Sequence, residues 1–78
     1  MRQDEQIKRE FGRALRSVRT KAGLSQERLA AKAGLNRTYV GDVERRERNI
    51  SIVNMRKLAV ALGVSLSALI REMESRRG

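Results

Sequence analysis

The chain has 78 residues, enough for one small domain, and its 18 lysine and arginine residues against 9 acidic residues give a formal net charge of +9. It contains no cysteine and no histidine, which excludes a disulfide framework, the ordinary zinc ligand sets and the commonest general base. No apolar run reaches the roughly 18–20 residues that span a bilayer, and the charged N-terminus is unlike a secretory signal peptide. We therefore expect a cytoplasmic chain with a polyanionic partner.

The first predicted helix covers about residues 5–21. One apolar residue recurs every three or four positions, which is the spacing of a single helical face: Ile7, Phe11, Leu15 and Val18. Asp4 is the expected N-cap, and Gly23 is the expected stop.

Two short helices are predicted next. The first covers about residues 26–33, between the N-cap Ser25 and the terminating Gly34. The second covers about residues 37–46 and begins after the N-cap Asn36. Its expected buried face consists of two valines, with one aromatic residue at the margin: Val40, Val43 and Tyr39.

The last two predicted helices cover about residues 52–62 and 66–75. Ser51 and Ser65 are their expected N-caps, and Gly63 ends the first of them. The apolar face of the first is Ile52, Met55, Leu58, Ala59 and Leu62. The stripe of the second is Leu66, Leu69, Ile70 and Met73.

These elements predict a compact all-α domain of five helices. A single domain is expected over residues 1–78, with its core in about residues 5–74. Residues 26–46 contain two short helices joined by about three residues that include a glycine. In a basic chain, this spacing is typical of a helix-turn-helix unit.

The polar face of the segment 37–46 points to a close external contact. Arg37 opposes the helix dipole, at a cost of roughly 0.3–1 kcal/mol, and Gly41 costs about 1 kcal/mol relative to alanine. A recognition helix presents its first residues to base edges in the major groove, where arginine bonds guanine and threonine contacts a thymine methyl. Arg37 and Thr38 stand at those positions. The alternative is that Arg37 is an ordinary solvated arginine.

Residues 11–70 resemble the Cro/cI-type (XRE-family) DNA-binding domain. The matching stretches are residues 16–19, 23–30, 43–45 and 58–65. Within that family the chain resembles the controller proteins of restriction–modification systems, on residues 36–40, 44–45 and 48–52. The resemblance implies the lambda-repressor-like fold, and a regulator that binds its own operator as a dimer and controls the endonuclease gene and its own.

The resemblance also implies a set of DNA contacts at the start of the two helices: Gln26, Asn36, Arg37, Thr38 and Tyr39. Gln26 matches a phosphate-contacting glutamine, although an ordinary solvated residue remains the alternative. Arg37 and Thr38 match the positions that read bases. Tyr39 either places its hydroxyl on a phosphate or is an aromatic residue at the edge of the core.

A basic loop follows the recognition helix, and the resemblance implies phosphate contacts for several of its residues: Arg45, Arg46, Arg48, Asn49 and Ser51. Ile50 stands where a proline is common in the family. Asp42 places a carboxylate on the expected DNA face. It either accepts a hydrogen bond from cytosine N4 or, as we favour, pairs within the chain with Arg45 or Arg46.

Two further sets of residues have expected structural roles. The resemblance implies that Arg19 and Glu44 form an ion pair that fixes the recognition helix and does not contact DNA. A two-fold dimer is expected because one recognition helix reads few base pairs. The residues expected at the dimer interface are Val53, Val60, Ile70 and Met73.

The sequence therefore predicts a sequence-specific transcriptional regulator whose partners are a palindromic double-stranded operator and a second copy of the chain. We expect no enzyme activity, cofactor, metal, small-molecule ligand or membrane association, and we expect nucleoid association of the bound form. One alternative is a phage-type or antitoxin-like repressor of the same fold. An alternative of another class is a coactivator-like adaptor that binds proteins.

Overall fold

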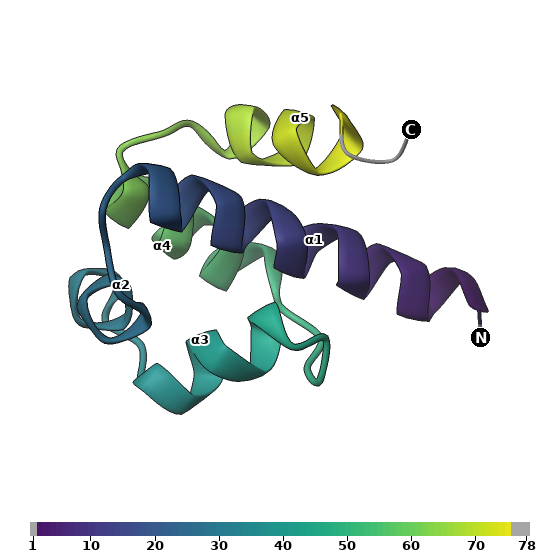
Figure 1. Ribbon diagram of the computed structural model, residues 1–78, viewed down its shortest axis with the longest axis horizontal. Helices are drawn as coiled ribbons and strands as arrows, with labels where there is room; N and C mark the ends of the chain where they lie inside the picture. Colours follow the sequence, from purple (N-terminus) through teal and green to yellow (C-terminus); the bar gives the residue numbers. More distant parts are fainter. Residues whose placement is uncertain (1, 76–78) are drawn as a thin grey trace.

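The computed structural model describes residues 2–75 and contains five helices in this part of the chain (Figure 1). Their bounds are α1 Arg2–Lys21, α2 Gln26–Ala33, α3 Arg37–Glu44, α4 Ile52–Leu62 and α5 Leu66–Ser75. The predicted all-α fold is confirmed. Residues 1 and 76–78 of the predicted domain lie outside the described residues.

Two helix ends differ from the prediction. Helix α1 begins at Arg2, so that Asp4 lies in its first turn, where a carboxylate favours the positive end of the helix dipole. Helix α3 ends at Glu44 and not at Arg46, because Arg45 caps it and Arg46 takes the left-handed conformation with φ 70°.

Short polar side chains begin the helices, as the sequence predicts. In each case the backbone N–H three residues further along donates to the side-chain oxygen of the cap, at 2.8–3.1 Å. The caps are Ser25 before α2, Asn36 before α3, Ser51 before α4 and Ser65 before α5. Each cap satisfies an N–H group that has no partner within its helix. The sharp turn after α2 is made by Gly34, whose φ of 72° is one that glycine adopts without a steric penalty.

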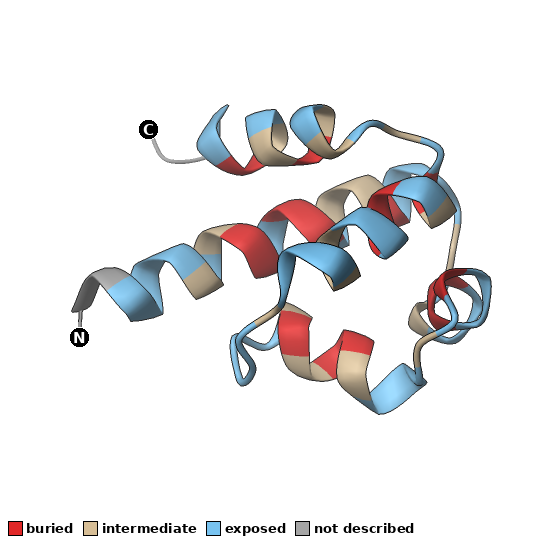
Figure 2. Ribbon diagram, turned by 180° about the vertical axis from the view of Figure 1, so that it is seen from behind, coloured by how far each residue is buried: buried red, intermediate tan, exposed pale blue. Residues whose placement is uncertain are grey.

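The core lies between the helices, and buried positions line their inner faces (Figure 2). Each of the five helices contributes one of the largest fully buried side chains: Leu15, Leu29, Val40, Leu58 and Leu69. Two predicted core residues are exposed instead. Ile7 lies near the free end of α1, and Ile52 is in the first turn of α4 on its outer side.

Helix α1 packs against both α5 and α3, and α2 packs against α3 and α4 (Figure 1). The crossing of α1 over the end of α3 occurs at Gly12, where a side chain has no room. Because these contacts fix α3 from one side only, its outer side remains open to solvent. In the described part of the chain no single helix is long and apolar enough to cross a membrane, although α4 and α5, bent by 97°, pass the same test together.

Candidate nucleic-acid interface

The first turn of α3 is exposed to solvent (Figure 2). Asn36 caps this turn through its Oδ1, which accepts from the Tyr39 N–H at 2.8 Å. Arg37 and Thr38 follow, and both are exposed. Among residues 2–75, no side chain forms a hydrogen bond or ion pair with the Arg37 guanidinium. All five of its N–H donors are therefore available to a ligand.

Gln26 at the start of α2 is held in place by α3. Its Nε2 donates to Glu44 Oε1 at 3.0 Å, which uses one of the two amide donors and leaves the other. Both Gln26 and Arg45 lie over Gly41, where an added Cβ would stand 3.5 Å from Gln26 Oε1 and 3.1 Å from Arg45 Nη1. The start of α2 and the end of α3 therefore form one continuous polar surface.

A buried ion pair supports this surface from below. Arg19 Nε donates to Glu44 Oε2 at 2.7 Å, and Arg19 Nη2 donates to Glu44 Oε1 at 2.9 Å. The side chains are only 11% and 4% exposed, and Arg19 Nη1 also donates to the carbonyl of Leu24 at 2.8 Å. The hydrogen bond to Glu44 raises the pKa of Arg19 above its ordinary value. Because Glu44 also accepts from Gln26, it joins α1, α2 and α3.

Asp42 does not project freely onto the expected DNA face. Its Oδ1 accepts from Arg45 Nη2 at 2.8 Å, and its Oδ2 accepts from Arg48 Nη2 at 3.2 Å. The pairing within the chain that the sequence favoured is therefore present with Arg45. The second partner is Arg48, six residues along and beyond helical spacing, and not Arg46.

Tyr39 is half-buried beside these arginines. Its hydroxyl accepts a hydrogen bond from Asn54 Nδ2 at 3.0 Å, and the guanidinium of Arg48 stacks over its ring, 5.0 Å from the centroid. The phenolic proton is still able to donate outward. Asn54 was not found from the sequence, because helical periodicity alone does not tell which polar residue of α4 faces α3.

The basic loop turns sharply after α3. The N–H of Glu47 donates to the Asp42 carbonyl at 2.8 Å, and the N–H of Arg46 donates to the Val43 carbonyl at 3.1 Å. This is the Schellman arrangement, with arginine in the left-handed position that usually holds glycine. Arg46 and Asn49 are exposed, Ile50 packs against the core, and the Ser51 hydroxyl caps α4.

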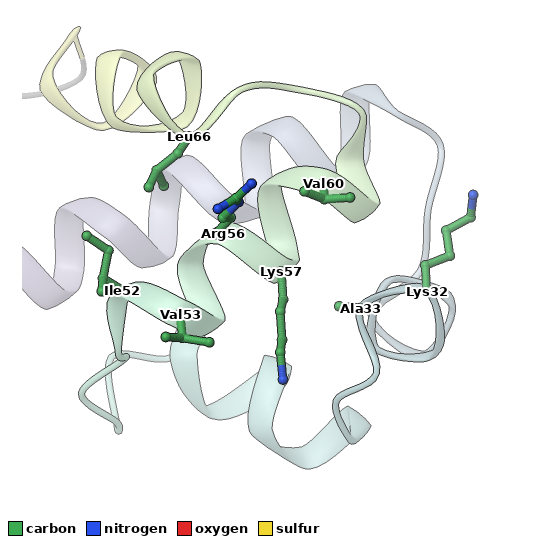
Figure 3. Close-up of a pocket in the computed structure, with 8 residues that line it drawn as sticks. All are labelled: Lys32, Ala33, Ile52, Val53, Arg56, Lys57, Val60 and Leu66. Atoms are coloured by element: carbon green, nitrogen blue, oxygen red, sulfur yellow. The ribbon is translucent and has the colours of Figure 1, made fainter.

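The residues predicted for a dimer interface do not lie together. Val53 and Val60 are 61% and 68% exposed and line a groove of about 600 Å³ over α2, α4 and α5 (Figure 3). Its other lining residues are Lys32, Ala33, Ile52, Arg56, Lys57 and Leu66. Ile70 is half-buried at a different groove of about 240 Å³, beside Met55 and Phe11. Met73 lines the same groove as Ile70, but only 9% of it is exposed and it packs in the core of the protomer.

Acidic side chains are scattered over the described residues and do not gather into a metal-binding group. No three of them approach closely enough to hold a metal ion. The carboxylates of Asp42 and Glu44 are instead engaged by arginines.

Comparison with known proteins identifies the family. The model of the helix-turn-helix family HTH_3 matches residues 15–69. The chain is 44% identical over 69 residues to the control protein C.MunI of Mycoplasma sp, covering 87% of this chain and 93% of the relative. It is 44% identical over 61 residues to the control protein C.BamHI of Bacillus amyloliquefaciens, covering 77% of this chain and 75% of the relative.

A solved structure is similar as well. The restriction–modification controller protein C.AhdI from Aeromonas hydrophila is 53% identical and superposes with a TM-score of 0.78, covering 80% of this chain and 94% of that one. The family consists of transcription regulators and is not a class of enzymes. The chain therefore belongs to the helix-turn-helix family, in the group of the restriction–modification control proteins.

Proposed function

We propose that the chain is a sequence-specific transcription regulator that binds a palindromic operator as a homodimer and controls its own gene and an endonuclease gene. The observation that carries this proposal is the exposed Arg37 at the start of α3, which has no partner among the described residues. An arginine at this position is able to bond guanine O6 and N7 at once. Thr38 beside it reaches the neighbouring base edge.

Phosphate contacts are assigned to the residues around the base-reading pair. Gln26 retains a free amide donor, Tyr39 a phenolic proton, and the arginines several N–H groups beyond those used within the chain. The remaining contacts are assigned to Asn36, Arg46, Asn49 and Ser51. Asp42 is left out of the DNA contacts, because both of its oxygens already accept from arginines.

The charge of the chain supports the same proposal. A net charge of +9 on 78 residues favours the displacement of counterions from the phosphate backbone. Binding is therefore expected to weaken steeply with salt, and the phosphate contacts orient α3 without reading sequence. The regulator works in the cytoplasm and is associated with the nucleoid while it is bound.

The proposed dimer interface is the groove that contains Val53 and Val60, together with Ile52 and Leu66. A two-fold axis beside the groove would set the same patch of each protomer against the other. The aliphatic parts of the Arg56 and Lys57 side chains cover the edge of the groove, and their charged ends stay in water. Ile70 and Met73 are left out of the interface.

Selection from a library of random-sequence DNA duplexes tests the proposal. The selected duplex should contain two half-sites about 34 Å apart, and it should bind at least 1,000-fold tighter than a shuffled duplex of the same composition. Equal affinity for the selected and shuffled duplexes would refute sequence-specific binding. Sedimentation of the free and bound protein tests the dimer independently.

A further inference from the structure

Asp42 occupies an unusual place for a carboxylate. It lies on the outer side of α3, between two arginines that the proposed function sets against DNA phosphates. Its side chain is only 17% exposed, whereas those of Arg45 and Arg48 are 58% and 48% exposed. One oxygen accepts from each arginine, at 2.8 and 3.2 Å. An acidic group here subtracts attraction for DNA, so it needs a reason other than affinity.

Stability does not supply that reason. Both arginines are exposed, so each ion pair is expected to contribute only between about 0 and 1 kcal/mol, because solvent screens the arginine charge and a long side chain loses conformational freedom. Neither pair joins two helices, since Arg45 caps α3 and Arg48 belongs to the following loop. The two ion pairs instead fix the positions of the guanidinium groups of Arg45 and Arg48, whose long side chains are otherwise free to move.

A second contact fixes Arg48 further. Its guanidinium lies 5.0 Å from the centroid of the Tyr39 ring, and the Tyr39 hydroxyl is itself held by Asn54 of α4 at 3.0 Å. The Arg48 guanidinium is therefore held by Asp42 at its edge and by the Tyr39 ring at its face. Arginine nevertheless has five N–H donors, so those not directed at Asp42 remain free for a phosphate.

We propose that Asp42 is a positioning residue that sets how strongly the protein discriminates between its operator and other DNA. It holds the guanidinium groups of Arg45 and Arg48 at fixed positions. From these positions they reach phosphates only when the protein is placed on the DNA so that Arg37 also contacts its base. In any other placement the held arginines fit poorly, and the carboxylate offsets part of their charge. This inference rests on the proposed function.

The test compares Asp42→Asn with the wild type on two probes: the duplex selected by this chain and its shuffled counterpart. The substitution keeps the shape and releases the arginines. We expect affinity for the shuffled duplex to rise about 3- to 10-fold, and its salt dependence to steepen by about one ion, because freed arginines follow any phosphate. The ratio of the two affinities should fall by a similar factor.

Glu47→Gln is the matched control. It removes the same charge five residues further along the chain, but Glu47 is 61% exposed and only approaches Arg45 Nε, at 3.5 Å. We expect it to change the ratio of affinities by less than twofold. If Asp42→Asn and Glu47→Gln change that ratio equally, charge alone explains the effect and positioning by Asp42 is overturned.

A double substitution tests whether Asp42 acts through its two partners. In the Arg45→Ala, Arg48→Ala background, Asp42→Asn should leave the ratio of affinities unchanged. A further drop there would overturn the inference. Asp42→Glu, which keeps the charge, should restore most of the discrimination, and its failure to do so with thermal stability unchanged would also count against positioning.

The outcomes separate this inference from the proposed function. If the wild type binds the selected and shuffled duplexes alike, the proposed function fails. If the wild type discriminates and Asp42→Asn discriminates equally well, the proposed function stands and the role of Asp42 is overturned.

Discussion

Gly12 of α1 and Val43 of α3 approach so closely that a Cβ atom on Gly12 would lie 2.8 Å from the Val43 carbonyl oxygen. The same atom would lie 2.9 Å from the carbonyl oxygen of Glu44. Both neighbours are backbone atoms, which move only if the helices separate. This contact sets the distance between α1 and the end of α3.

Gly12→Ala should therefore destabilise the domain by about 2 kcal/mol or more, although alanine favours a helix over glycine. Gly41→Ala is the matched control within α3. There the nearest atoms are the ends of the flexible Arg45 and Gln26 side chains, so the better helix propensity should dominate and stabilise by up to about 1 kcal/mol. Urea unfolding followed by circular dichroism measures the free energy of unfolding of both variants. A change of the same sign in both would contradict the close-packing argument.

The buried pair of Arg19 and Glu44 gives a second prediction. Glu44→Ala leaves the Arg19 guanidinium without its carboxylate in a nearly dry site, and should lower the free energy of unfolding by about 3–5 kcal/mol. Lys8→Ala is the control, because its pair with Glu5 at 3.5 Å is more exposed and its loss should cost less than about 1 kcal/mol. A similar loss of unfolding free energy in both variants would show that the buried pair stabilises the domain no more than the exposed pair does.

Most of the helix bounds were predictable from the sequence because short-range features set them. Serine and asparagine caps and left-handed glycines act over a few residues, so the bounds of α2, α4 and α5 follow from them. The end of α3 was misplaced because Arg46 adopts a conformation that normally requires glycine. Asp4 proved to be an internal residue of α1, since nothing in composition stops a helix from extending into solvent.

Contacts between distant segments were harder to predict. Asn54 meets Tyr39, and Asp42 meets Arg48, only because the loop after α3 folds back over that helix. Periodicity identified apolar positions but did not separate core from surface near helix ends, so Ile7 and Ile52 were placed in the core although both are exposed. Tertiary packing decides which part of a helix faces its neighbours.

Val53→Glu tests the proposed dimer. A carboxylate in the centre of an apolar contact loses water without a partner, so the dissociation constant of the dimer should rise by more than about tenfold. Ile7→Glu is the control, because Ile7 is also exposed but lines the other groove. Sedimentation velocity over a range of concentrations measures both. Dissociation by Ile7→Glu and not by Val53→Glu would move the interface to the groove beside α1.

The division between base reading and phosphate contact gives a further prediction. Arg37→Ala should cost about 1–3 kcal/mol on the selected duplex and relax sequence preference, because a bidentate contact to guanine is lost. Arg48→Ala should weaken binding to the selected duplex and reduce its salt dependence by about one ion, but should leave the preferred base at each position unchanged, because a phosphate contact reads no sequence. Competition binding at several salt concentrations separates the two effects. The reverse pattern would exchange the two roles.

Arg46 supplies the last test, because it separates backbone strain from charge. Its φ of 70° costs a residue with a Cβ atom roughly 1–2 kcal/mol, and glycine avoids that cost while gaining some freedom in the unfolded chain. Arg46→Gly should therefore stabilise the domain by about 1 kcal/mol, whereas Arg46→Ala should leave its stability within about 0.5 kcal/mol of the wild type. Both variants lose the same charge, so both should bind the selected and shuffled duplexes more weakly, to the same extent. Unequal losses would mean that the left-handed turn itself, and not only the guanidinium, shapes the contact with DNA.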